Sequence, residues 1–159
     1  MTATELQDDD VRDLYRELIL DHARNPRHFG KLEHTTHSAE GINPLCGDKL
    51  KLYLDVDNAD TILAVAFEGS GCAISVASAS LLTDTIVGLE SEQAIRYFEA
   101  VTSHLRGDAE FQERPPVDLG KLRALEGVRE YPSRVKCATL AWHALRSALC
   151  HDATPATTE

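Results

Sequence analysis

Hydrophobic and polar residues follow two different periods along this chain, and the periods predict where helices and strands lie. In residues 11–24, apolar residues recur every three or four positions and form one stripe of a helix, made of Val11, Leu14, Tyr15, Leu18, Ile19 and His22. From Leu50 to Val56, apolar and polar residues alternate, as they do in a strand with one buried face. A second strand over 61–69 follows the turn at 57–60, so we expect a hairpin.

The second half of the chain is predicted to be mainly helical. Helices are expected from Cys72 to Gly88, over 91–107 and over 134–150, with a short helix within 121–132. Ser91 and Ser133 each precede a helical segment, where a hydroxyl side chain commonly serves as the N-cap. Each of these two serines is therefore predicted to cap the helix that follows it.

Together these elements predict an α+β fold, in which a small antiparallel β-sheet of about three strands is packed with helices. Residues 26–45 and 108–120 are mixed or polar, and we expect loops there, with one edge strand in the first segment. The expected organisation is a single domain over 11–150, between a flexible N-terminus at 1–10 and a disordered tail at 151–159.

The composition narrows the classes of function. The chain has 159 residues, of which 43% are hydrophobic and 26% charged, as is ordinary for soluble globular proteins. The formal net charge is −10 and no basic stripe is visible, so we expect no nucleic-acid partner. No run approaches the roughly 20 apolar residues that a membrane-spanning helix needs, and the acidic start MTATELQDDD is unlike a secretory or transit signal. We therefore expect a cytoplasmic protein with no membrane partner.

Three of the four cysteines stand at the ends of predicted elements. Cys46 precedes a strand, Cys72 lies in the glycine-rich start of a helix, and Cys137 lies about one turn into the last helix. Helix N-termini favour thiolate over thiol because they present free N–H groups. In a reducing compartment such thiols more often bind metal or react than form disulfides. Cys150 lies at a helix end and is interpreted as an ordinary structural residue. Most of the seven histidines are interpreted as surface or helix-face residues, and they show no H-E-x-x-H pattern.

Asp48 adds an oxygen ligand close to Cys46. In an extended segment, residues two positions apart point to the same side, and Gly47 between them permits a tight backbone. Three thiolates and one carboxylate match the four-ligand preference of zinc, and thiolates suit iron with sulfide equally well. Arg134 and Lys136 in the last helix are candidate compensating cations. The cysteine spacing contains no C-x-x-C pair. From spacing alone, the alternative to a metal site is that these cysteines are small buried side chains.

Four segments together resemble the U-type iron–sulfur cluster assembly proteins. They are LYRELILDHARNPRHFG, NPLCGDKLKL, GSGCAISVASASLLTD and YPSRVKCATLAWHAL, which follow one another from about Leu14 to Leu149. The chain is similar to the SufU branch more than to the IscU branch in two respects. The segment between the second and third of these cysteines is long, and Lys136 stands where the IscU branch has a histidine. The resemblance implies the SufE/IscU-like fold.

The resemblance also implies a function. It implies a zinc site whose ligands are Cys46, Asp48, Cys72 and Cys137. Cys46 would accept sulfur from a pyridoxal-phosphate cysteine desulfurase of the SufS kind, and Arg134 matches an arginine linked to function. As a mechanistic hypothesis of our own, Lys136 or Arg134 would steady the developing negative sulfur. The protein would then be a zinc-dependent sulfurtransferase that serves downstream iron–sulfur assembly proteins. The alternatives are a scaffold that builds an iron–sulfur cluster at the same ligands and passes it to apo-proteins, and a purely structural zinc.

Overall fold

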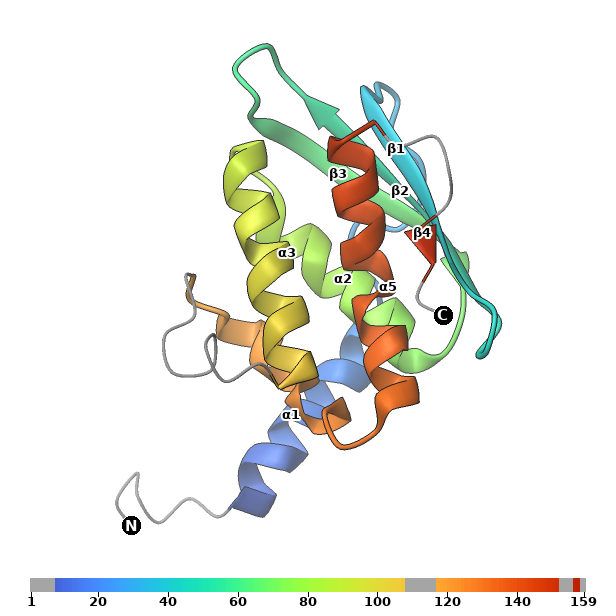
Figure 1. Cartoon of the computed structure of the whole chain (residues 1–159), viewed down its shortest axis with the longest axis vertical. Helices are drawn as coiled ribbons and strands as arrows, with labels where there is room; N and C mark the ends of the chain where they lie inside the picture. The colour runs from blue at the N-terminus through green and yellow to red at the C-terminus, as the bar shows by residue number, and fades with distance from the viewer. Residues whose placement is uncertain (1–7, 108–116, 152–155, 158–159) are drawn as a thin grey trace.

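The computed structural model describes residues 8–107, 117–151 and 156–157, and in it helices cover one face of a β-sheet (Figure 1). The strands are β1 (His37–Asn43), β2 (Asp48–Val56), β3 (Ile62–Ser70) and β4 (Ala156–Thr157), in the spatial order β3-β2-β1-β4. The helices are α1 (Asp8–Arg24), α2 (Ala73–Ile86), α3 (Ser91–Arg106), the 3₁₀-helix η2 (Gly120–Val128) and α5 (Pro132–Leu149). The predicted α+β class with three antiparallel strands is confirmed.

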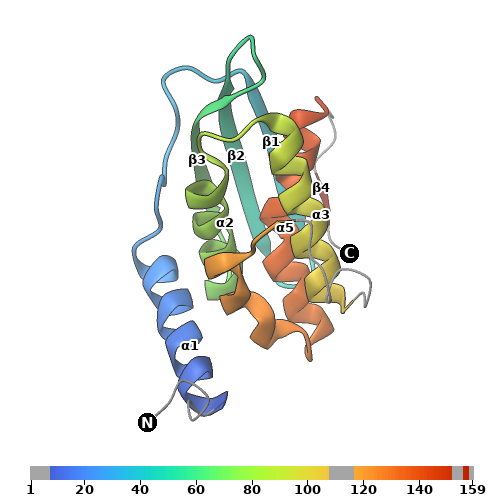
Figure 2. The same ribbon diagram turned by 90° about the vertical axis from the view of Figure 1, so that its left-hand side faces the viewer.

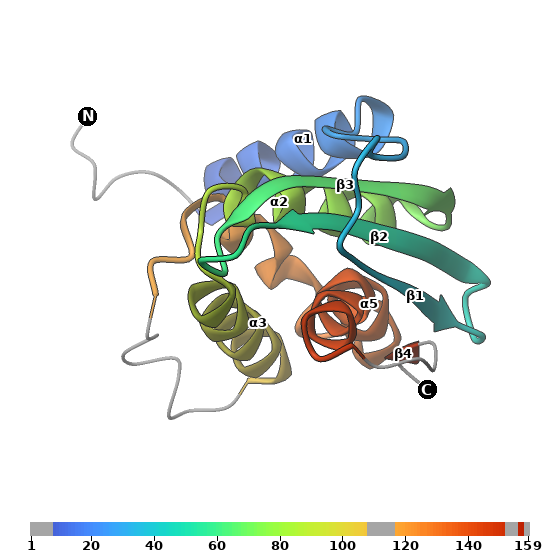
Figure 3. The same cartoon turned by 90° about the horizontal axis from the view of Figure 1, so that it is seen from above.

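Two helices lie directly on the sheet, and the others pack outside them (Figures 2 and 3). Helix α2 contacts β3, α5 contacts β1 and β2, and the two helices also contact each other. Helix α3 packs on α5, while α1 packs on α2 and η2. No helix within the described ranges combines the length and the apolar character that crossing a membrane requires.

The alternation along β2 produces the core beneath the helices. The predicted inward-facing residues are all buried, and they are Leu50, Leu52, Leu54 and Val56. Burial of each such side chain stabilises the fold by roughly 1.5–3 kcal/mol. Helix α2 is buried on most sides and carries serines as well as apolar residues. The hydroxyl of Ser78 donates to the carbonyl of Ala138 and accepts the Trp142 indole N–H at 3.2 Å, so this buried polar group is satisfied.

Helix α1 packs on the rest of the fold through the C-terminal part of its predicted apolar stripe. Ile19 and His22 are buried, whereas Leu14 is 62% exposed. Leu14 therefore does not share the burial of Ile19 and His22, although it has the spacing of the same predicted stripe. Figure 2 shows the N-terminal part of α1 extending past the end of α2. Nδ1 of His22 lies 2.7 Å from Oγ of Ser80 in α2, and this hydroxyl oxygen also accepts the backbone N–H of Arg27. Burial lowers the pKa of His22, which favours the neutral ring.

Both predicted N-caps are wrong by one or two residues. Helix α3 has Glu90 as its N-cap, which forms a capping box, and the hydroxyl of Ser91 instead donates to a carbonyl in the β2–β3 turn. Helix α5 has Tyr131 as its N-cap and Pro132 at the first helical position, where the missing N–H removes no helical hydrogen bond. Ser133 therefore lies inside the helix.

Strand β4 is not predicted by the sequence pattern. Residues 156–157 pair in parallel with Gly41 and Ile42 of β1, inside the segment expected to be a disordered tail. Two consecutive residues give no alternation to recognise, so only the tertiary contact reveals the strand. The expected flexible N-terminus at 1–10 differs at its end, because residues 8–10 already belong to α1. The rest of that segment and parts of the polar connection and the tail lie outside the described residues, at 1–7, 108–116, 152–155 and 158–159.

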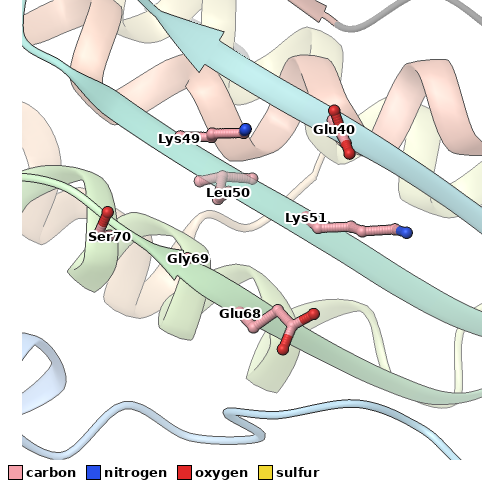
Figure 4. A pocket seen from close by; sticks show the side chains of 7 residues that line it. All are labelled: Glu40, Lys49, Leu50, Lys51, Glu68, Gly69 and Ser70. Carbon is pink, nitrogen blue, oxygen red and sulfur yellow. The ribbon is translucent and has the colours of Figure 1, made fainter.

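The sheet face away from the helices is charged. Lys51 of β2 stands opposite Glu40 of β1 and Glu68 of β3 in the register of the sheet. Figure 4 shows these side chains and Lys49 around a shallow pocket of about 280 Å³. Charges of both signs are typical of a solvated face of an antiparallel sheet. None of the predicted site residues lines this pocket.

Candidate metal centre

Four chain segments meet at the end of the sheet where β1 turns into β2. Cys46 lies in the four-residue turn between these strands, Asp48 begins β2, Cys72 is the N-cap of α2, and Cys137 is the sixth residue of α5. Figure 1 shows this turn on the same side of the molecule as the first residues of α2 and α5. The turn is short because Asn43 and Asp48, which flank it, are partners in the antiparallel ladder.

The sulfurs of Cys46 and Cys137 and a carboxylate oxygen of Asp48 are close enough to share one ion, and Cys72 lies beside this group of three. The sulfurs of Cys46 and Cys137 are 3.3 Å apart, and one ligand atom from each of Cys46, Asp48 and Cys137 lies within 4.8 Å of the other two. The sulfur of Cys72 is 3.9 Å from Oδ2 of Asp48. Sulfurs around a tetrahedral zinc with Zn–S bonds of about 2.3 Å stand about 3.8 Å apart. In the described part of the chain, no other group of three potential ligands is this compact.

The carboxylate of Asp48 is held from two sides. Its Oδ1 accepts the backbone N–H of Cys72 at 2.8 Å, and its Oδ2 accepts the amide N–H of Asn43 at 3.4 Å. Gly71 makes this approach possible, because a Cβ at that position would lie 2.6 Å from Oδ1 of Asp48. Neither Gly71 nor Asn43 is predicted as a site residue, and the only sequence signals are their places in GSGC and NPLCGD.

Burial separates the four residues into three that are shielded and one that is accessible. Asp48 and Cys137 are 1% and 0% exposed, and Cys72 is half-buried. Cys72 is fixed further because its sulfur accepts the backbone N–H of Ser75 at 3.4 Å, as the N-cap of α2. Cys46 is exposed in its turn. Cys46 is therefore the thiol of this cluster that a protein partner can reach most readily.

The cluster gathers groups that all become negative when they bind a metal. Burial, followed by hydrogen bonds with Asp48, Cys46 and Cys72, raises the pKa of the Cys137 thiol. Three thiolates and a carboxylate so close together require a compensating cation, and a divalent metal supplies the largest local charge. A donor set of three sulfurs and one oxygen fits zinc, and it fits iron with sulfide as well.

A buried polar atom without a partner lies beside the cluster. Asn43 is 0% exposed, and its Nδ2 also lies 3.5 Å from the sulfur of Cys137. Its Oδ1 has no hydrogen bond, and among the described residues it is the one buried side-chain nitrogen or oxygen in that state. An unpaired buried acceptor destabilises a fold by about 1–3 kcal/mol. This cost in folding stability, at a residue beside the ligand cluster, indicates that Asn43 meets a requirement of the cluster rather than of the fold.

The structure does not bring the two predicted cations into contact with the cluster. Arg134 is exposed on the first turn of α5, and Lys136 is half-buried one residue before Cys137. Neither side chain makes a hydrogen bond or an ion pair with any part of the chain that the structure describes. Both nevertheless lie in the first two turns of the helix that carries Cys137.

The likeness to known proteins covers nearly the whole described fold. Residues 14–149 match the family described as the NifU-like N terminal domain. The zinc-dependent sulfurtransferase SufU of Bacillus subtilis (strain 168) is 39% identical over 139 residues, which cover 87% of this chain and 91% of that protein. The iron–sulfur cluster assembly scaffold protein IscU of Streptococcus pyogenes serotype M1 is 38% identical over 137 residues, which cover 86% of this chain and 82% of that protein.

A solved structure shows the same fold. A candidate iron–sulfur cluster assembly scaffold protein for the SUF system, from the thermophile Fervidobacterium islandicum AW-1, superposes with a TM-score of 0.74 at 33% identity. The superposition covers 84% of this chain and 94% of that chain. Sequence and structure thus agree over the strands and helices that carry the three clustered cysteines, and this chain belongs to the family of the NifU-like N-terminal domain.

Proposed function

We propose that this protein works in iron–sulfur cluster assembly as a zinc-dependent sulfurtransferase. Cys46 is the sulfur acceptor, and a pyridoxal-phosphate cysteine desulfurase of the SufS kind is the donor. The observation that carries the proposal is the contrast between exposed Cys46 and buried Cys137, whose sulfurs are 3.3 Å apart. A thiol that reacts with a partner must be reachable, whereas a ligand that only holds a metal is better buried. The Bacillus subtilis relative, 39% identical, is named a zinc-dependent sulfurtransferase.

Four residues would hold the metal, and they are Cys46, Asp48, Cys72 and Cys137. Bound zinc supplies the positive charge that keeps the coordinating sulfurs deprotonated. Asp48 and Cys137 are held by burial, and Cys72 by its place at the start of α2. Cys46 lies in a surface turn, where few packing contacts oppose a local movement toward a partner. The formal net charge of −10 suits a basic docking surface on that partner.

The proposed transfer is a thiol–persulfide exchange. The thiolate of Cys46 attacks the outer sulfur of the persulfide on the desulfurase. A bond forms between Sγ of Cys46 and that sulfur, the sulfur–sulfur bond of the donor breaks, and the donor cysteine leaves as a thiolate. Cys46 then carries the persulfide, and neither an oxidant nor a reductant is consumed. Arg134 and Lys136 do not contact the cluster in this structure, and their proposed role is to turn toward the anionic sulfur from the start of α5 during the transfer.

The second candidate function is a scaffold on which an iron–sulfur cluster is built at the same four residues and passed to apo-proteins. Thiolates are the usual ligands of such clusters. The Streptococcus pyogenes relative, 38% identical, is named a scaffold protein. We favour sulfur transfer because the exposure of Cys46 sets it apart from Asp48, Cys72 and Cys137.

Metal analysis combined with a desulfurase assay tests the proposal. The protein is purified anaerobically without chelators, and its zinc, iron and acid-labile sulfide are measured. It is then added to a SufS-type desulfurase with cysteine and a reductant, and alanine formation is followed against the desulfurase alone. We expect about one zinc per chain, no labile sulfide, and faster alanine formation. If the protein contains iron and labile sulfide and does not accelerate alanine formation, the scaffold function is supported instead. If it contains zinc but does not accelerate alanine formation, the zinc is only structural. Either result overturns the proposal.

A further inference from the structure

The side chain of Asn43 bridges two of the proposed metal ligands. Asn43 ends β1 and pairs with Asp48 across the ladder, so it closes the turn that carries Cys46. Its amide nitrogen lies 3.4 Å from Oδ2 of Asp48 and 3.5 Å from the sulfur of Cys137. A primary amide has two N–H donors, one for each of these acceptors. The reaction proposed above gives Asn43 no role.

The partners determine which way the amide faces. An ionised carboxylate and a thiolate only accept hydrogen bonds, so a carbonyl oxygen turned toward Asp48 and Cys137 would be repelled by both. Oδ1 of Asn43 therefore points away, and it finds no hydrogen-bond partner within the described structure. An apolar side chain of similar shape would avoid leaving this buried acceptor unpaired. Leucine would remove this cost but would also withdraw an N–H donor from the buried carboxylate of Asp48, so the advantage of asparagine lies in its donors.

We propose that Asn43 is a positioning residue of the metal centre. Its two N–H groups hold the Asp48 carboxylate and the Cys137 sulfur in the places from which they bind the metal. Hydrogen bonds to ligands orient them, and their loss typically weakens metal affinity by about 10- to 100-fold. The N–H beside Cys137 also stabilises the electron pairs of that sulfur, as hydrogen bonds do at iron–sulfur centres. The inference rests on the proposed metal site and is independent of sulfur transfer.

Asn43→Leu tests the inference with cobalt(II) as the probe, because sulfur-to-cobalt charge-transfer absorption reports thiolate ligands directly. We expect cobalt(II) and zinc to bind about 10- to 100-fold more weakly, as measured by competition with a chromophoric chelator. The charge-transfer band should move to longer wavelength, since the electrons of Cys137 are no longer stabilised by an N–H. The urea concentration at which metal-free Asn43→Leu unfolds is measured alongside, so that a loss of metal affinity is separated from a loss of stability.

The control is Asn58→Leu, in the exposed β2–β3 turn at the opposite end of these strands, which should leave affinity and spectrum unchanged. Asn43→Thr keeps one hydroxyl donor and should fall between wild type and Asn43→Leu; it replaces Asn43→Leu if that variant does not fold. The inference is overturned if Asn43→Leu binds cobalt(II) with wild-type affinity and shows the wild-type band position. It is also overturned if metal-free Asn43→Leu is less stable than the wild type while its charge-transfer band does not move. A wild-type protein that binds no cobalt overturns the metal site itself.

Discussion

Replacing Cys46 by serine should reduce desulfurase turnover to the rate of the desulfurase alone. The serine hydroxyl cannot become a persulfide, so the exchange has no acceptor. Cys46 is exposed in a turn, and its removal takes nothing from the core, so the metal-free variant should unfold near the wild-type temperature. The measurement is alanine formation in the presence of cysteine, together with mass spectrometry of the acceptor for the gain of one sulfur atom.

Cys150→Ser provides the matched control for this experiment. Cys150 is also exposed, but it stands at the far end of α5, about 20 Å along the helix axis from Cys137. This variant should accelerate the desulfurase as the wild type does. Full acceleration by Cys46→Ser, or a persulfide found on Cys72 in the wild type, would remove Cys46 from the acceptor role.

Asp48→Ala should weaken zinc binding at least about 100-fold, which corresponds to about 2.8 kcal/mol of binding free energy. The substitution removes the oxygen ligand, and it also leaves the backbone N–H of Cys72 and the amide N–H of Asn43 without their acceptor. Two neighbours of the site thereby lose their alignment. The dissociation constant is measured by chelator competition, and an unchanged value would show that Asp48 is not a ligand.

Gly71→Ala disturbs the same carboxylate without removing it. The added Cβ would lie 2.6 Å from Oδ1 of Asp48, so the carboxylate must move away from the Cys72 N–H. Zinc affinity should fall to a value between those of the wild type and Asp48→Ala. Gly127→Ala in η2 is the matched control, because a Cβ there meets nothing within 4 Å and its φ is not positive. Equal affinities of the Gly71→Ala and Gly127→Ala variants would contradict the role assigned to this contact.

The strands and most helices could be predicted because each has one buried face with its own period. The alternation from Leu50 to Val56 predicts β2 correctly, since α5 covers only one face of that strand. The positions of Cys72 and Cys137 near the starts of helices also follow from sequence. The spacing of the cysteines does not show that their sulfurs bind one ion, because small buried cysteines would have the same spacing. The hypothesis of a shared ion comes from the family resemblance.

The features that sequence patterns did not predict depend on contacts between distant segments. Leu14 has the spacing of the predicted helical stripe, yet it is 62% exposed. Gly71 matters through the carboxylate of Asp48, which lies 23 positions earlier in the chain. Asn43 matters through Cys137, which lies 94 positions later. Periodicity describes a segment and its burial, but not which atoms of another segment it meets.

X-ray absorption at the zinc edge, on protein isolated without chelators, tests the central claim most directly. That claim is that the sulfurs of Cys46, Cys72 and Cys137 and the carboxylate of Asp48 bind one metal ion. The spectrum should show three sulfurs at about 2.3 Å and one oxygen at about 2.0 Å. The claim would be contradicted if the protein contained neither zinc nor iron and all three thiols were freely alkylated. It would also be contradicted if the zinc were surrounded only by nitrogen and oxygen.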